Sequence, residues 1–260
     1  SRGGPGVGSI QPAQMDYFQA TRASGNGGFQ MMVFAPSTVQ EAVDMTYAAF
    51  DYADRDRNPV LILADGVIGT MMEPVVLPGM KSEEEVAALK ASKQGWACVG
   101  HKLDYAHRAW IQPGHWLTSD MQKANEDAAA LYESWKKDVQ VEEYREDGLY
   151  LEGIVKSAVE LLRAQGVKAG LIRPITVHPF PYAAYDHIDY SKVKAVLDVE
   201  MSIPAQFVDD VAVAVKDRCL IKTCLCSGGN IMSRDKVLAA VKKIMEGKYC
   251  LLYTSPSPRD

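Results

Sequence analysis

The sequence predicts an α/β fold in which parallel or mostly parallel sheets are flanked by helices. Two short apolar runs without alternation, at 31–35 and 60–64, are typical of strands buried on both faces. Between them, residues 39–54 carry apolar side chains at steps of three and four, the pattern of one helix face. A strand, a helix and a strand in this order indicate a parallel sheet with a right-handed crossover.

The ends of this first helix carry their own signals. Ser37 with Gln40 fits a capping box at the start, and Asn58-Pro59 stops the helix. Further helices are expected in the first half of the chain at 14–19, 82–90 and 120–137.

A second stretch repeats the alternation of strands and helices. Strands are expected at 168–172, 193–199 and 219–225, and helices at 154–165, after Pro181, at 204–216 and at 233–245. We therefore divide the chain into one unit at 1–75, a linker with a helix at 76–140, and a second unit at 141–249. Residues 250–260 have no apolar period and resemble the translation of a sequencing adapter, so we expect a non-native tail there.

Composition excludes several classes of partner. A net charge of -5, a pI near 5.6 and the lack of a Lys/Arg cluster argue against nucleic acid. No apolar run approaches the roughly 20 residues that span a bilayer. The start of the chain has no secretory signal pattern, so a cytoplasmic location is expected.

The cysteines and histidines give no metal site. The five cysteines are irregularly spaced, and Cys224-Leu-Cys226 lacks a second ligand pair, so we expect neither a disulfide framework nor a metal. The five histidines are too scattered to form a metal constellation.

The Gly-rich start, 2–8, is RGGPGVG. Its third glycine falls one residue early for a dinucleotide fingerprint, and it lacks the Lys-Ser/Thr of a P-loop. It does place the planar guanidinium of Arg2, suited to a carboxylate or phosphate, beside glycines that let a ligand approach the backbone. An arginine on a surface turn is the alternative.

Several blocks in the same order carry a resemblance to a known family. They are 2–19 (RGGPGVGSIQPAQMDYFQ), 35–41 (APSTVQE), 49–53 (AFDYA), 57–60 (RNPV), 65–69 (DGVIG), 71–74 (MMEP), 171–181 (LIRPITVHPFP) and 199–201 (VEM). Together they resemble the α (core) subunit of thiamine-diphosphate-dependent 2-oxoacid:ferredoxin oxidoreductases. The resemblance implies the C-terminal part of a pyrimidine-binding domain, with a parallel sheet flanked by helices, followed by a transketolase C-terminal-like α/β domain.

The resemblance also implies a reaction. Members oxidatively decarboxylate a 2-oxoacid to acyl-CoA and CO2 and reduce ferredoxin, with thiamine diphosphate and Mg bound mainly by a partner β subunit. Coenzyme A is the co-substrate, and iron–sulfur clusters lie on partner subunits, with a γ subunit and a ferredoxin-like subunit completing the complex. The glutamate that activates the cofactor is expected upstream of Ser1, because the chain matches the family from mid-domain onward and is expected to be truncated at both ends.

The same resemblance implies site residues. Arg2 falls where the family contacts the substrate carboxylate, although it could instead anchor the domain interface. Gly3 and Gly4 fall at the edge of the thiamine pocket, and we interpret Gln14 and Asp16 as side chains that fix loops.

Two departures from the family pattern stand out. Relatives usually have Gly-His-Gly and an acidic residue where this chain has 25–28 (GNGG), so a titratable histidine is replaced by an amide. Around 149–154 the chain is shorter than the pattern, which leaves the first strand of the second unit in doubt.

The loop after Arg2 favours the branched-chain (3-methyl-2-oxobutanoate, or 2-oxoisovalerate) branch. The alternatives are a 2-oxoglutarate or pyruvate enzyme, or a non-catalytic scaffold subunit of such a complex. We expect the isolated chain to be inactive and to bind thiamine diphosphate negligibly.

Overall fold

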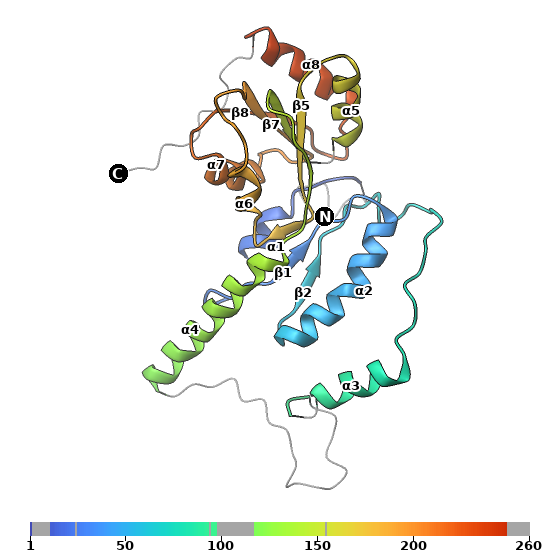
Figure 1. Cartoon of the computed structure of the whole chain (residues 1–260), viewed down its shortest axis with the longest axis vertical. Helices are drawn as coiled ribbons and strands as arrows, with labels where there is room; N and C mark the ends of the chain where they lie inside the picture. Colours follow the sequence, from blue (N-terminus) through green and yellow to red (C-terminus); the bar gives the residue numbers. More distant parts are fainter. Residues whose placement is uncertain (2–10, 24, 94, 98–116, 154, 249–260) are drawn as a thin grey trace.

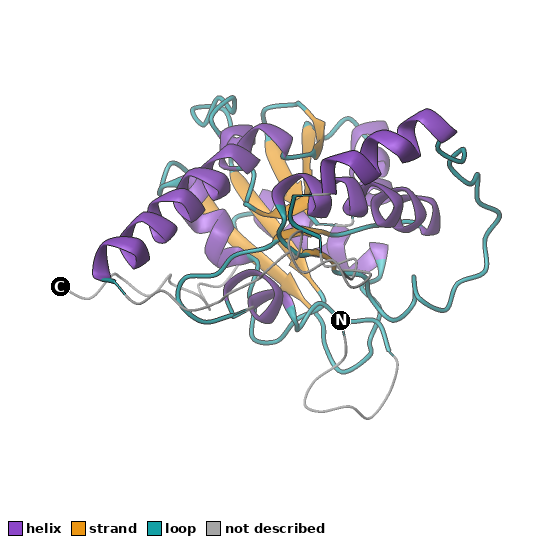
Figure 2. Ribbon diagram, turned by 90° about the horizontal axis from the view of Figure 1, so that it is seen from below, coloured by secondary structure: helices purple, strands orange, loops and turns teal. Residues whose placement is uncertain are grey.

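The computed structural model describes residues 1, 11–23, 25–93, 95–97, 117–153 and 155–248. These residues form two sheets with helices on both sides (Figures 1 and 2). The strands are β1 (Met32–Phe34), β2 (Val60–Ile62), β3 (Val141–Tyr144), β4 (Leu149–Glu152), β5 (Ala169–Pro174), β6 (Thr176–His178), β7 (Ala195–Glu200) and β8 (Leu220–Leu225). The helices are α1 (Tyr17–Arg22), α2 (Val39–Asp56), α3 (Glu83–Lys93), α4 (Thr118–Ser134), the 3-10 helix η2 (Trp135–Asp138), α5 (Lys156–Ala164), α6 (Tyr182–Tyr185), α7 (Val208–Val215) and α8 (Arg234–Met245).

The first sheet has the order β2-β1-β6. β1 and β2 are parallel and joined through α2, as predicted. All three residues of β1 are buried, because Met32 and Phe34 face one core and Val33 faces the other. The prediction of a strand covered on both sides is therefore confirmed for β1, but it is wrong for β2, whose three residues are only half-buried.

The start of α2 differs from the predicted capping box by one residue. Thr38, not Ser37, caps the helix, and its side chain accepts a hydrogen bond from the Glu41 N–H. The Glu41 carboxylate accepts in return from the backbone and hydroxyl of Ser37, so it is Glu41, not Gln40, that completes the box. At the other end, Arg57 adopts a left-handed conformation immediately before Asn58-Pro59.

The third strand of the first sheet comes from the predicted second unit. β6 pairs antiparallel with β1, so this sheet is mixed rather than purely parallel. The segment had no strand signal, because three residues between Pro174 and Pro179 are too short to show a period.

The second sheet has the order β3-β5-β4-β7-β8. β5, β4, β7 and β8 are parallel, and only the edge strand β3 is antiparallel, which confirms a mostly parallel sheet. The strand around 149–154 that the sequence left in doubt is β4, at the centre of the sheet. Gly153 follows it with φ +96, and a Cβ there would lie 2.6 Å from the Val199 carbonyl oxygen, so this turn requires glycine.

Helices cover the second sheet on both faces. α5 and α8 pack on one face and α6 and α7 on the other (Figure 1). Alternate residues of each strand therefore enter opposite cores: Leu149, Leu151 and Leu197 face α5 and α8, whereas Tyr150 and Val196 face α6 and α7. No helix in the described residues is long and apolar enough to cross a membrane.

The helical part of the predicted linker ends on the first sheet. α4 extends away from the body, and the chain then turns through η2 (Figure 1). Trp135 in η2 is buried against Met32 and Phe34, and its indole N–H donates to the Asp56 carboxylate at 2.9 Å. This contact holds the end of the linker against β1 and α2.

Candidate functional site

A pocket of about 740 Å³, including the open solvent at its mouth, lies where the carboxyl ends of strands from both sheets meet. Residues just after β1 and β2 form one side, and the ends of β5 and β7 form the other. Ligands of open α/β sheets bind at the carboxyl ends of strands, so this is the expected place for a site. The residues that line it are Ser1, Ala13, Gln14, Tyr17, Ala35, Pro36, Leu63, Asp65, Ile68, Arg173, Pro174, Val177, Val199, Glu200 and Phe207.

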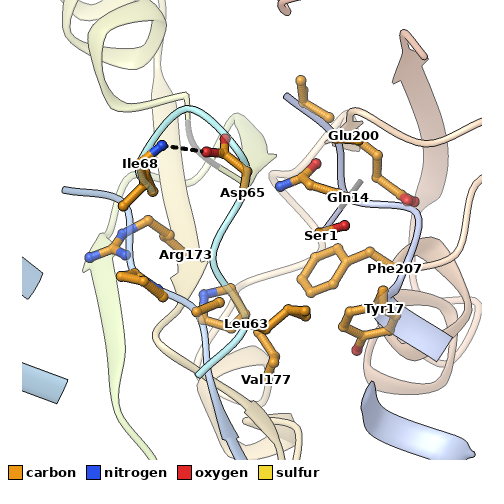
Figure 3. A pocket seen from close by; sticks show the side chains of 15 residues that line it. Ser1, Gln14, Tyr17, Leu63, Asp65, Ile68, Arg173, Val177, Glu200 and Phe207 are labelled. Atoms are coloured by element: carbon orange, nitrogen blue, oxygen red, sulfur yellow. Dashed lines mark hydrogen bonds between the residues drawn. The ribbon is translucent and has the colours of Figure 1, made fainter. Parts of the chain in front are cut away.

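The walls of the pocket are mainly apolar, with a few polar groups. Figure 3 shows Tyr17 and Phe207 close together beside the cavity, and their rings meet edge to face with centroids 5.4 Å apart. Leu63 and Val177 add aliphatic surface from the first sheet. Such walls suit a flat, largely apolar group.

Asp65 follows β2 and begins the turn of the 65–69 block. Its Oδ1 accepts from the Ile68 N–H at 2.8 Å (Figure 3). The hydrogen bond fixes the turn and places Asp65 and Ile68 on the pocket wall.

Arg173, on β5, is bound to two carboxylates. Its Nη1 and Nη2 donate to Glu41 at 3.1 and 2.7 Å, and its Nε donates to Glu142 at 2.7 Å. Burial alone would raise the pKa of Glu41, but hydrogen bonds from Ser37 and Arg173 outweigh it and lower that pKa. Arg173 thus joins α2 to β3 and β5. The N–H donors of its guanidinium group are already bound to Glu41 and Glu142.

Gln14 fixes the segment before α1 to the loop after β7. Its backbone N–H donates to the Met201 carbonyl at 2.9 Å, and its side-chain oxygen accepts from the Met201 N–H at 2.7 Å. This confirms the predicted loop-fixing role of Gln14. The predicted loop-fixing role of Asp16 stays a prediction.

Tyr17 belongs to a network around Asp210. Its hydroxyl donates to Asp210 at 2.7 Å, Tyr182 donates to the same carboxylate at 3.1 Å, and Arg22 pairs with it at 3.0 Å. Burial and the neighbouring Asp210 carboxylate raise the pKa of Tyr17 well above its usual value. Tyr17 therefore remains a neutral phenol at the pocket wall.

Glu200 is the buried acid of the pocket. Its carboxylate accepts from the backbone N–H of Gln206, at 2.9 and 3.2 Å, and of Val208, at 3.0 Å. Backbone N–H groups at the start of a helix have no partner within the helix. Glu200, at the end of β7, accepts from two of them and so caps α7.

The residues predicted to form the site are not all described. Arg2, Gly3 and Gly4 lie outside the described residues, although Ser1 lines the pocket. Tyr17, Asp65, Glu200 and Phe207 were not singled out from the sequence. Asp65 and Glu200 lie within the matched blocks at strand ends, so the rule for carboxyl ends of strands could have found them.

The structure offers no metal centre in the part of the chain that it describes. No group of three or more His, Cys, Asp or Glu side chains there could hold a metal ion. His178 instead contacts the Gln30 side chain at 3.1 Å, and burial lowers the pKa of His178. Cys224 and Cys226 are buried and unpaired with each other.

Comparisons with known proteins cover nearly the whole chain. Residues 1–145 match the family described as pyruvate flavodoxin/ferredoxin oxidoreductase, thiamine diP-bdg, and residues 148–237 match pyruvate:ferredoxin oxidoreductase core domain II. A ketoisovalerate oxidoreductase subunit VorB from Methanothermobacter thermautotrophicus is 32% identical over 257 residues, which cover 94% of this chain and 68% of that protein. A 2-oxoglutarate synthase subunit KorA from Methanocaldococcus jannaschii is 28% identical over 233 residues, covering 78% of this chain and 61% of that protein.

A solved structure agrees with the fold. It is a 2-oxoglutarate:ferredoxin oxidoreductase from Magnetococcus marinus with 2-oxoglutarate, coenzyme A and succinyl-CoA bound, and it matches with a TM-score of 0.66 at 19% identity. The match covers 94% of this chain and 47% of the matched chain, so it spans less than half of that chain's length. At this identity the likeness bears on the fold alone.

Proposed function

Because the chain belongs to the pyruvate:ferredoxin oxidoreductase-type family of 2-oxoacid oxidoreductases, we propose that it is the α subunit of a 2-oxoacid:ferredoxin oxidoreductase. The complex oxidatively decarboxylates a 2-oxoacid to acyl-CoA and CO2 and reduces ferredoxin. The single observation that carries the proposal is the thiamine-diphosphate family match over residues 1–145, which includes the strand ends beside the pocket. The favoured substrate is a branched-chain 2-oxoacid, in agreement with the ketoisovalerate subunit at 32% identity.

The described pocket suits the ring part of thiamine diphosphate but not its diphosphate. Its apolar walls, with Tyr17 and Phe207, suit a flat ring or the side chain of a branched 2-oxoacid. Arg173 is the only cationic side chain on the wall in the described residues, and Glu41 and Glu142 already neutralise it. Among the described side chains the pocket thus offers no free cation to the diphosphate, which supports the proposal that the diphosphate and Mg bind on the partner β subunit.

We assign substrate contact to the start of the chain. Arg2 orients the 2-oxoacid carboxylate, while Gly3 and Gly4 border the thiamine pocket and let the ligand approach the backbone. The support is that Arg2 follows Ser1, which lines the pocket. A fixed carboxylate directs the keto carbon toward the cofactor.

When bound, the cofactor would supply the carbanion chemistry. The chain would orient the substrate and exclude water from the pocket. The apolar walls exclude water around the reacting carbon. Tyr17, as a neutral phenol held by Asp210, keeps its ring fixed beside Phe207. Asp65 and Glu200 are held by backbone N–H groups, which keeps the pocket wall in one shape.

The proposed assembly contains further chains. These are a thiamine-binding β subunit, a γ subunit and a ferredoxin-like iron–sulfur subunit. The iron–sulfur clusters lie on these partner subunits, coenzyme A is the co-substrate and ferredoxin is the electron acceptor.

We retain the division of this chain into 1–75, 76–140 and 141–249 as a proposal; the tail at 250–260 lies outside the described residues. A cytoplasmic location is favoured because Cys219, Cys224 and Cys226 are free thiols.

A substrate panel tests the proposal. The chain is assembled with its partner subunits and supplied with thiamine diphosphate, Mg and coenzyme A, and reduction of ferredoxin is followed with 2-oxoisovalerate, 2-oxoglutarate and pyruvate. We expect the largest kcat/KM with 2-oxoisovalerate. A clear preference for 2-oxoglutarate or pyruvate contradicts the branched-chain assignment, and no turnover with any 2-oxoacid favours the scaffold alternative.

The assignment of Arg2 has its own test. Arg2→Ala removes a charge-assisted bidentate contact, so we expect kcat/KM for the 2-oxoacid to fall about tenfold to a hundredfold. Arg2→Lys keeps the charge but not the fork and should restore only part of the rate. Arg145→Ala is the matched control, because Arg145 is exposed and pairs with Glu143; an equal loss in both alanine variants contradicts a specific role for Arg2.

Cofactor binding by the isolated chain gives a third check. We expect calorimetry to detect no micromolar binding of thiamine diphosphate, because the described pocket has no free cation for the diphosphate. Micromolar binding by the chain alone would contradict the division of the cofactor site between two subunits.

A further inference from the structure

Three buried acidic side chains lie on the face of the second sheet that α6 and α7 cover, and one of them, Glu200, also lines the pocket. Glu152 on β4 and Asp198 on β7 are direct partners across the parallel pairing, and Glu200 lies two residues beyond Asp198 on the same face. Their exposed fractions are 0%, 0% and 2%. Like charges side by side in a dry site are strongly unfavourable, so the three cannot all be carboxylates.

The hydrogen bonds of the three acids are unequal. Glu200 accepts from two backbone N–H groups at the start of α7, and Glu152 Oε2 accepts from the Tyr185 hydroxyl at 2.9 Å. Both oxygens of Asp198 have no hydrogen-bond partner that can donate within the described residues. Asp198 and Glu200 lie two residues apart on one face of β7, so their carboxyl groups are neighbours.

Two carboxyl groups bond to each other only when one of them carries a proton. Glu200 is the acceptor of this pair, because its oxygens already receive two N–H donors. We propose that Asp198 is a protonated acid that donates to Glu200, and that this pair is a positioning element that holds the β7–α7 loop at the pocket.

Hydrogen bonds connect the pair to the pocket wall. Glu200 holds the N–H of Gln206, and the Gln206 side chain in turn donates to the Met15 carbonyl and accepts from the Phe18 N–H, both at 2.8 Å. Phe207, next to Gln206, lines the pocket. A change at Asp198 is thereby transmitted to residues 15–18, which carry Tyr17.

The surroundings agree with a neutral Asp198. Burial, and after it the neighbouring Glu200 carboxylate, raise the pKa of Asp198 well above its usual value, with Glu152 and Cys224 acting in the same direction. Burial also raises the pKa of Glu152 to about 8, against a hydrogen bond from Tyr185 that lowers it. A proton on one of these acids relieves the repulsion between them.

Infrared spectroscopy tests the proton directly, without any assumption about activity. The whole chain is prepared with isotope-labelled aspartate carboxyl groups, so that aspartic acid bands separate from those of Glu152. We expect a protonated aspartic acid band at neutral pH that persists in Glu152→Gln and disappears in Asp198→Asn. No labelled acid band at neutral pH, or one unchanged in Asp198→Asn, overturns the proposal.

Amide hydrogen exchange tests the positioning. Asp198→Asn keeps a donor to Glu200 and should leave exchange at Phe18 and Gln206 unchanged, whereas Asp198→Ala removes the donor and should accelerate it at least about tenfold. In the wild type the protection of the same amides, relative to their intrinsic exchange rate at each pH, should fall as Asp198 loses its proton at high pH, and Asp198→Asn should lack this fall in protection. Equal protection in the wild type, Asp198→Ala and Asp198→Asn overturns the positioning role.

The pocket role rests on the proposed function, so the assembled complex supplies a last readout. We expect Asp198→Ala to raise the KM for the 2-oxoacid more than it lowers kcat, with Asp198→Asn close to wild type. An inactive wild-type complex would refute the proposed function and leave the infrared and exchange results standing. An active complex whose KM is the same in both variants would refute only the link between Asp198 and the pocket.

Discussion

The two sheets differ in how completely the chain covers them. The five-stranded sheet has a buried core on each face, formed by α5 and α8 on one side and α6 and α7 on the other. The three-stranded sheet is covered by smaller clusters, and α2 has no buried residue at all although it carries the crossover. We therefore expect the second sheet and its helices to contribute most of the free energy of unfolding. The first sheet has less buried apolar surface of its own.

Exposed apolar side chains gather on α2 and in the segment that follows β2. Phe50 on α2 is 70% exposed, and after β2 the side chains of Met72 and Met80 are 98% and 99% exposed, with Val76 and Leu77 also open. Exposed apolar side chains in such number are common where subunits meet. The contrast with the closed second sheet is the basis of the following predictions.

The largest expected effect is a truncation in the core of the second sheet. Leu151 is completely buried in the central strand β4, so Leu151→Ala should lower the free energy of unfolding by about 2–5 kcal/mol. Phe50→Ala on α2, a larger truncation, should change it by only about 0.5 kcal/mol. Urea unfolding of both variants measures the difference, and similar losses at the two positions would contradict the unequal cores.

A smaller loss is expected where the two regions are joined. Arg173→Ala leaves the carboxylates of Glu41 and Glu142 without their shared partner and should cost about 1.5–3 kcal/mol. Arg173→Lys should recover only part of this, since lysine lacks the fork.

The matched control for this change is Arg55→Ala. Arg55 also pairs with two carboxylates, Asp56 and Asp138, but its side chain is 42% exposed, so its loss should cost less than about 1 kcal/mol. Chemical denaturation ranks the variants, and an Arg55 effect as large as that of Arg173 would show that burial of the guanidinium does not matter.

The buried acids give the second sheet a pH dependence. Glu152 has a pKa of about 8 in the folded chain and an ordinary value near 4.3 when unfolded, so the folded state binds more protons between these values. The free energy of unfolding should therefore fall as pH rises through this window, by at most about 1.4 kcal/mol per pH unit for this group. Asp198 should act in the same direction.

Glu152→Gln isolates this contribution. Unfolding measured from about pH 5 to about pH 9 should show a flatter profile in the variant than in the wild type. Parallel profiles would mean that Glu152 does not keep its proton in the folded chain.

The smallest effect is expected on the exposed stretch of the first region. Met72→Ser and Met80→Ser should change the free energy of unfolding of the isolated chain by no more than about 0.5 kcal/mol, because both side chains are almost fully exposed. A loss above about 1 kcal/mol, measured by urea unfolding, would show that this stretch packs on the chain itself.

Much of the fold could be predicted because the signals are local. The helix at Val39–Asp56 and the strands at β1, β2, β5, β7 and β8 follow apolar patterns within a few residues of sequence. β3 was missed because VEEY carries two acidic residues, one of which, Glu142, is there to meet Arg173 from β5. A strand with such a side chain has no apolar period to detect.

The candidate site could be predicted only in part, because its residues are brought together over long separations. Tyr17 and Asp210 are 193 residues apart, and Glu41 and Arg173 are 132 apart. Local motifs do indicate which blocks matter, as with Asp65 and Glu200, but they cannot show that these blocks face one cavity. The acid pair in β7 was hidden for another reason: Asp198 and Glu200 alternate with apolar residues as in any half-exposed strand, and only the structure shows that α6 and α7 bury them.

The insertion of β6 into the first sheet has a consequence for dividing the chain. β1 and β6 are adjacent in the sheet, yet every element from α2 to β5 lies between them in sequence. A break at Gly95, after α3, would therefore yield two polypeptides that each hold part of one sheet, and the halves should reassociate when expressed together. Recovery of a folded complex from the two co-expressed pieces would measure how strongly the β1–β6 pairing joins them.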